Sequence, residues 1–181
     1  SYDKRKIIDD VSLSIPEKTT TAIVGPSGGG KSTLCNLIAR FWDVDEGEVS
    51  LGGINVTDYS MNSLMNNFAF VFQRVYLFAV SIARAIMKDA PIIILDEATA
   101  NVDPENEKEL IEAIDALTKE KTIIMIAHRL KTVRNADQIV VIDKGRIVQQ
   151  GTHNQLMKQE GIYKRFVDSR EKAVSWKLAN D

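Results

Sequence analysis

The sequence has few of the features that would suggest a secreted, membrane-spanning or nucleic-acid-binding protein. A single cysteine, Cys35, permits no internal disulfide, so we expect a reducing, cytoplasmic setting. The longest apolar run, residues 75–83, includes a serine and is far shorter than the roughly 20 residues that a membrane helix needs. Lysine and arginine number 23 against 25 aspartate and glutamate, so no basic excess favours a nucleic-acid partner.

What remains is enough apolar material for one globular core. The chain has 181 residues, of which 44% are hydrophobic, and this fits a single domain. Short β-branched runs alternate with longer helical patterns, which predicts an α/β fold with a largely parallel sheet flanked by helices. The runs that we expect to be strands buried on both faces are residues 19–24, 68–72, 92–95, 122–127 and 138–142. Helical spacing occurs at residues 31–41 and 105–117.

Further segments extend this architecture at its edges. Residues 7–15 and 48–51 are predicted to be additional, antiparallel strands. Residues 146–150 follow a turn as the hairpin partner of the strand before them. Residues 152–168 indicate two short helices that break at Gly161, and the polar tail from Ser169 is expected to fray.

A glycine-rich loop between a predicted strand and a predicted helix carries the strongest chemical signal. Residues 25–32 fit the pattern G-x-x-x-x-G-K-[ST]. Glycines let consecutive backbone amides turn inward around a phosphate, Lys31 reaches the terminal phosphates, and the Ser32 hydroxyl can ligate Mg²⁺. A plain glycine-rich turn would not require that lysine and hydroxyl. The residues expected to bind the nucleotide here are Gly25, Pro26, Ser27, Gly28, Gly29, Gly30, Lys31, Ser32 and Thr33.

An acidic pair ends the predicted strand at residues 92–95. Strand alternation puts Asp96 and Glu97 on opposite sides, so they should have different roles. At the carboxyl edge of a parallel sheet, Asp96 can hold the hydration shell of magnesium, while Glu97 faces the γ-phosphate and polarises the attacking water. Acidic pairs also cap strands and start turns, and the phosphate loop upstream is what favours the catalytic interpretation.

Taken together, these motifs resemble those of the nucleotide-binding domain of ABC transporters, and the likeness covers nearly the whole chain. The family's Walker A loop is matched by GPSGGGKST, and its Walker B strand with the D-loop by IIILDEATANVD. Its Q-loop is matched by FQ and its switch histidine by IAHR, in the family's order. The tail GRIVQQGTHNQLMKQEGIYKRF is similar to that of exporter-type members. The resemblance implies a P-loop NTPase fold that binds ATP and Mg²⁺ and hydrolyses ATP to power export.

The resemblance assigns roles to four further residues, each with a plainer alternative. Tyr2 would stack on adenine, or be an unattached surface residue. Gln73 would offer an amide oxygen to Mg²⁺ or water and couple the site to the membrane partner, or be a solvated loop residue. His128 would hydrogen-bond the γ-phosphate, or be a structural histidine at a strand end. Asp103 would lie at the interface between two such domains, and it also suits the N-cap of the helix at residues 105–117.

The resemblance also implies partners, a location and a division of the chain. The partners are the transmembrane domain of an exporter, on the same polypeptide, and a second ATPase domain in a head-to-tail dimer, with no nucleic acid. The location is the cytoplasmic face of the cell membrane. His153 matches no catalytic position and is interpreted as a surface or capping residue, and Cys35 as an inert core residue. The parts of the single domain would be an antiparallel β part (1–18 and 46–60), a RecA-like core (19–45 and 61–151) and C-terminal helices with a tail (152–181).

One feature of the family is missing from this sequence. Family members carry a helical subdomain ending in the signature LSGGQ between the Q-loop and Walker B, but here only 22 residues separate Gln73 from Asp96 and LSGGQ occurs nowhere. The interruption lies between Phe78 and Ala79, since residues 80–86 look like the rest of the helix that begins at the signature. Either the protein has a segment that is not represented here, which we favour, or the segment is deleted.

The missing segment leaves two main hypotheses about function. The first is an ATPase that drives export. The second is a nucleotide-binding module without turnover, because in the family the LSGGQ of one subunit closes over the nucleotide held by the other. A soluble ABC ATPase of DNA repair or translation is disfavoured by the exporter-like tail and the lack of a basic patch. A P-loop kinase is disfavoured further, because the matches to the Q-loop and the switch histidine would then be coincidences.

Overall fold

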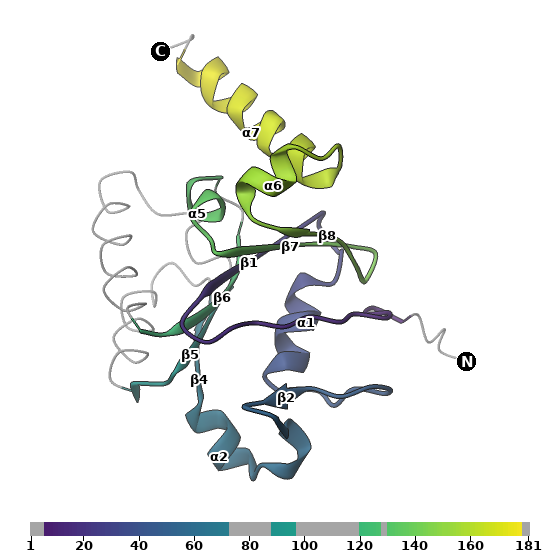
Figure 1. The fold of residues 1–181 in the computed structure, drawn as a ribbon, viewed down its shortest axis with the longest axis vertical. Coiled ribbons are helices and arrows are strands. Elements are labelled where there is room, and N and C mark those ends of the chain that lie inside the picture. The colour runs from purple at the N-terminus through teal and green to yellow at the C-terminus, as the bar shows by residue number, and fades with distance from the viewer. Residues whose placement is uncertain (1–5, 73–87, 97–119, 128–129, 179–181) are drawn as a thin grey trace.

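The centre of the fold is a six-stranded sheet in the order β4-β5-β6-β1-β7-β8 (Figure 1). The computed structural model describes residues 6–72, 88–96, 120–127 and 130–178. Every pair of neighbours from β4 to β7 is parallel, and β8 pairs with β7 in the antiparallel sense. The strands are β1 (Thr20–Val24), β4 (Phe68–Phe72), β5 (Ile92–Asp96), β6 (Thr122–Ile126), β7 (Gln138–Asp143) and β8 (Arg146–Gly151). The predicted α/β fold with a largely parallel sheet is confirmed.

Helices cover both faces of this sheet, which explains why its central strands are almost wholly apolar. Alternate residues of each strand point to opposite faces, so Ala22 and Val24 of β1 belong to one core and Ile23 to the other. The first core packs against α5 (Leu130–Arg134), α6 (His153–Met157) and α7 (Ile162–Leu178). The second packs against α1 (Lys31–Ile38) and α2 (Met61–Asn66). The result is a three-layer arrangement with the sheet in the middle.

An antiparallel strand pair lies outside the main sheet. Its strands are β2 (Ser50–Leu51) and β3 (Ile54–Asn55), and the short 3₁₀ helix η1 (Val56–Asp58) follows. Gly52 and Gly53 join the two strands with φ of +60° and +80°, the pattern of a tight hairpin that glycine suits best. The expected antiparallel strand at 48–51 is therefore confirmed in shortened form.

The predicted strand at residues 7–15 is wrong, because that segment is extended without joining a sheet. Its side chains do alternate, with Val11, Leu13 and Ile15 half-buried against the second core. Asp10 has a left-handed φ of +52°, which interrupts a regular strand. Both edges of β1, moreover, are already taken by β6 and β7. The strand-like pattern therefore reflects packing without a hydrogen-bonded ladder.

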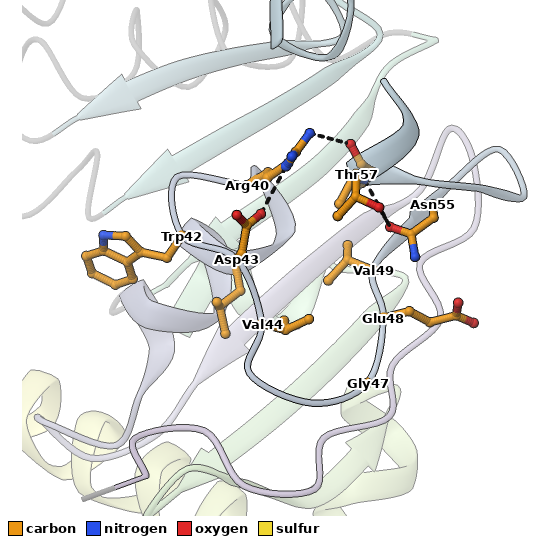
Figure 2. A pocket seen from close by; sticks show the side chains of 11 residues that line it. Arg40, Trp42, Asp43, Val44, Gly47, Glu48, Val49, Asn55 and Thr57 are labelled. Carbon is orange, nitrogen blue, oxygen red and sulfur yellow. Dashed lines mark hydrogen bonds and ion pairs between the residues drawn. The ribbon is translucent and has the colours of Figure 1, made fainter. Parts of the chain in front are cut away.

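The first helix, predicted to reach residue 41, ends at Ile38. Arg40 adopts a left-handed φ of +55°, and its N–H donates to the Leu37 oxygen while the Phe41 N–H donates to the Asn36 oxygen. This pair of bonds is the Schellman arrangement that ends a helix. The Arg40 guanidinium donates to Asp43 and to the Val56 oxygen, at 3.0 and 2.9 Å, and so offsets the cost of the left-handed backbone (Figure 2).

The C-terminal part contains the two helices predicted around Gly161, but the second is much longer than expected. α7 continues to Leu178, so the prediction of a fraying tail from Ser169 is wrong. Arg134 of α5 forms an ion pair with Glu171 of α7, and this contact holds part of the tail. His153, the first residue of α6, is half-buried, and its Nδ1 lies 2.8 Å from the Tyr163 hydroxyl. Burial and the nearby Arg134 charge lower the pKa of His153.

The join between Phe78 and Ala79 lies outside the described residues, as does the helix expected at 105–117. Both explanations for the absence of the helical arm therefore stay predictions. In the described part of the chain, no helix has the length and apolar character that a bilayer crossing requires.

Thr21 offers a test of this core. Its side chain is fully buried in β1, and within the described part of the molecule its hydroxyl has no hydrogen-bond partner. Thr21→Val replaces the hydroxyl by a methyl of similar shape, so we expect the free energy of unfolding to rise by about 1 kcal/mol. Urea denaturation followed by circular dichroism measures this change.

The matched control is Thr19→Val. The Thr19 hydroxyl donates to the Pro16 oxygen at 2.8 Å, so its removal is expected to lower the free energy of unfolding by about 1 kcal/mol. Equal losses of stability in both variants would show that the Thr21 hydroxyl has a partner after all.

Candidate functional site

The loop at residues 25–30 leaves the carboxyl end of β1 and enters α1, as the sequence predicts. Three of its glycines have positive φ: Gly25 (+148°), Gly28 (+74°) and Gly30 (+104°). Gly30 is the N-cap of α1, and no side chain caps this helix end. Residues 26–28 of the loop are exposed, whereas Gly29 and Gly30 are buried. We call residues 25–30 the phosphate loop.

Several backbone amides of the phosphate loop have no acceptor in the described part of the chain. The Gly29 N–H donates to the Pro26 oxygen at 3.2 Å, but the N–H groups of Ser27, Gly28 and Gly30 donate to no described group. A Cβ atom added at Gly28 would meet nothing within 4 Å, so there is open space beside the loop. Unsatisfied amides at a helix N-terminus, next to open space, form an arrangement suited to an anion.

Lys31, the first residue of α1, folds back over this loop. Its ammonium donates to the Gly25 oxygen at 3.1 Å and to the Pro26 oxygen at 2.8 Å. Only 8% of the residue is exposed, which is unusual for a lysine and means that its charge is held among the groups of the loop. Next to it on α1, Ser32 is exposed and Thr33 is half-buried.

The sheet register brings Asp96 to the same edge as the phosphate loop. Phe72, Asp96, Ile126 and Ile23 are paired across β4, β5, β6 and β1, so they lie level with one another. Asp96 is half-buried at the end of β5. The carboxyl ends of four parallel strands therefore meet beside the loop, which is the edge where open α/β sheets bind ligands.

Electrostatics also place the Asp96 carboxylate near α1. The pKa of the Cys35 thiol is raised to about 12, first by burial and second by the charge of Asp96. Cys35 lies one helical turn after Lys31, in the core between α1 and the sheet. The structure thus brings Lys31, Ser32 and Asp96, three of the predicted site residues, to one region.

Five other predicted site residues lie outside the described residues: Tyr2, Gln73, Glu97, Asp103 and His128. Gln73 and Glu97 directly follow the last residues of β4 and β5, and His128 comes two residues after β6 ends. Each of these three strands ends at the edge that carries the phosphate loop.

Sequence reasoning missed the residues that pack behind the phosphate loop. A Cβ atom added at Gly25 would overlap the Ile142 carbonyl, and the Gly145 N–H donates to the Gly29 oxygen at 3.0 Å. The only signal in the sequence was the glycine of the turn between β7 and β8, at Gly145.

The structure also has a pocket that is separate from the phosphate loop. It has a volume of about 140 Å³ and lies between the end of α1 and the segment around β3 (Figure 2). Arg40, Trp42 and Thr57 are among its lining residues, and none of the predicted site residues lines it. Its volume is below the 300 Å³ or so of a typical small-molecule site.

Comparisons with known proteins agree with this geometry. A family model described as ABC transporter matches residues 8–79. An ATP-dependent lipid A-core flippase of Vibrio vulnificus (strain YJ016) is 36% identical over 88% of this chain, and one of Desulfotalea psychrophila is 37% identical over 90%. The chain spans 37% and 38% of these relatives.

The same comparisons bear on the missing arm. The alignment with the Vibrio relative covers 218 positions, more than the 181 residues of the chain, so the relative has several tens of residues with no counterpart here. The family-model match ends at Ala79, where the interruption was predicted.

A solved structure extends the likeness to three dimensions. A bacterial Atm1-family ABC exporter with ATP bound superposes with a TM-score of 0.80, at 26% identity, over 94% of this chain and 40% of that one. Fold, motifs and relatives agree, and the chain therefore belongs to the ABC transporter family as an exporter-type nucleotide-binding domain.

Proposed function

We propose that this chain binds Mg-ATP at the phosphate loop and serves as the ATPase domain of an exporter. The observation that carries the proposal is the loop itself. The amides of Ser27, Gly28 and Gly30 donate to no described group and lie beside open space, and the buried Lys31 ammonium is held on the same loop. Such a site offers several donors and a cation to a polyphosphate without reorganisation of the backbone.

The roles of the described residues follow from their chemistry. Lys31 exchanges its two carbonyl acceptors for the terminal phosphate oxygens, which are stronger, charged partners. The Ser32 hydroxyl and the Asp96 carboxylate are hard oxygen donors of the kind that Mg²⁺ prefers, and Asp96 acts through the hydration shell. Mg²⁺, when bound, neutralises charge on the phosphates.

Other roles in this proposal come from the resemblance to the family. Glu97 polarises the attacking water, His128 contacts the γ-phosphate, and Gln73 contributes to the magnesium site. Tyr2 stacks on adenine, and Asp103 lies at the interface with a second domain. Pro26 and Thr33 complete the nucleotide contacts of the loop region.

The proposal includes partners and a location. The chain works with a transmembrane domain and pairs head to tail with a second ATPase domain, at the cytoplasmic face of the membrane. In support, the relatives are more than twice as long as the matched region and are named as flippases. The cargo is selected by the membrane helices of an exporter, so the proposal concerns only the energy supply.

A second candidate function is nucleotide binding without turnover. Two observations favour it: the sequence contains no LSGGQ, and the relatives have several tens of residues that this chain lacks. In the family, that signature closes over the nucleotide held by the opposite subunit. A chain without it retains the phosphate loop but cannot complete the catalytic site of its partner.

Replacement of Lys31 tests nucleotide binding. We expect Lys31→Ala to weaken the affinity for Mg-ATP at least about 100-fold, because the variant loses the cation that faces the phosphates. Isothermal titration calorimetry measures the dissociation constants. Lys158→Ala, which removes an exposed lysine at the end of α6, is the control and should bind as the wild type does. Wild-type affinity in Lys31→Ala would reject the site.

Steady-state phosphate release separates the two candidate functions. A nucleotide-binding module without turnover would bind Mg-ATP yet release phosphate no faster than Glu97→Gln, because the sequence contains no signature segment. In a chain given the family's helical arm, Glu97→Gln should keep Mg-ATP binding and lose hydrolysis by about 10² or more. Faster release from the unaltered wild type than from Glu97→Gln would instead make this chain a complete ATPase.

A further inference from the structure

The turn between β7 and β8 lies directly behind the phosphate loop and is hydrogen-bonded to it. The Gly145 N–H donates to the Gly29 oxygen at 3.0 Å, and the Gly145 oxygen accepts from the Asp9 N–H at 2.9 Å. We call residues 6–9 the N-terminal strap. A single residue of the turn therefore connects the phosphate loop to the strap, two segments that are far from it in sequence.

These three segments pack backbone against backbone. A Cβ atom added at Gly145 would overlap the Ile7 carbonyl, and Gly145 has a φ of +79°. A Cβ atom added at Gly30 would lie 2.9 Å from Ile8 Cδ1 and 3.3 Å from the Ile7 oxygen. The Ile8 side chain lies against Gly30, and no side chain fits at Gly145. The strap, the turn and the loop are therefore tightly packed, so movement of one segment is transmitted to the next.

An ion pair closes the strap over the turn. Arg146, next to Gly145, donates from Nε and Nη2 to the same oxygen of Asp9, at 3.1 and 2.6 Å. Exposed ion pairs contribute little by themselves. This one lies beside the Asp9–Gly145 backbone bond, and the two contacts together fix the strap on the turn.

The bond from Gly145 determines where an amide of the phosphate loop points. In a trans peptide the C=O and the following N–H point in opposite directions. With the Gly29 oxygen held by Gly145 behind the loop, the Gly30 N–H is directed to the opposite side of the loop. That amide belongs to the N-cap of α1 and donates to no described group.

We propose that Gly145 is a positioning residue for nucleotide binding: held by the strap, it orients the Gly29–Gly30 peptide so that the Gly30 N–H faces the phosphates. This inference rests on the proposed function, because the ligand of the loop is taken to be Mg-ATP. A fixed donor is worth more than one that must first be reoriented. The strap, although it is not part of the loop, thereby contributes to its affinity for phosphate.

The test uses Gly145→Ala in the whole chain, with two ligands. We expect its dissociation constant for Mg-ATP to rise about tenfold or more, the effect of one misplaced hydrogen bond to a charged group. The dissociation constant for magnesium tripolyphosphate, which has no adenosine, should rise by the same factor. Titration calorimetry well below the melting temperature of the variant gives both constants.

The control is Gly53→Ala. Gly53 has nearly the same φ, +80°, and a Cβ atom added there would meet nothing within 4 Å. This variant carries the same backbone strain without touching the loop, so its affinities should stay within about twofold of wild type. Unchanged Mg-ATP binding in Gly145→Ala overturns the inference. A wild type that binds no Mg-ATP overturns the proposed function instead.

A second pair of variants decides the matter if Gly145→Ala does not fold. Arg146 is largely exposed, so Arg146→Asp should fold while it breaks the ion pair, and we expect Mg-ATP affinity to fall several-fold. Adding Asp9→Arg restores an opposite-charge pair with the original net charge and should restore affinity. Wild-type affinity in Arg146→Asp, or no recovery in the double variant, overturns the role of the strap.

Discussion

The close contact of the phosphate loop with the backbone of β7 is the constraint on which the candidate site depends. Gly25 lies against the Ile142 carbonyl so closely that no side chain could be placed there. Ile142 is itself fully buried in the core under α1. The loop therefore takes its position from the fully buried part of a strand of the sheet.

The parallel sheet adds the second element of the site by register alone. Because β5 is level with β6 and β6 with β1, Asp96 comes beside the start of α1 without a direct bond between β5 and β1. The charge of Asp96 contributes to the raised pKa of Cys35 on α1, which reflects this proximity. A slip of one residue in β5 would turn Asp96 to the opposite face of the sheet.

Local patterns explain what could be predicted from the sequence. The strands are apolar on both faces and the phosphate loop is one contiguous motif, so both were recognisable. The end of α1 was not, because Arg40 is held in its left-handed conformation partly by the Val56 oxygen, 16 residues further on. The length of α7 likewise depends on contacts such as that of Glu171 with Arg134, and the support behind the loop on Gly145. A local stretch of sequence does not indicate such contacts between distant residues.

The burial of Cys35 has a practical consequence for work on this chain. It is the sole cysteine among 181 residues, 5% of it is exposed, and its thiol stays protonated at neutral pH. A cysteine introduced at an exposed position of the β7–β8 turn, such as Lys144, would therefore be the one thiol that a maleimide dye modifies in the folded protein. Fluorescence could then follow the turn behind the loop directly, with the wild-type core left intact.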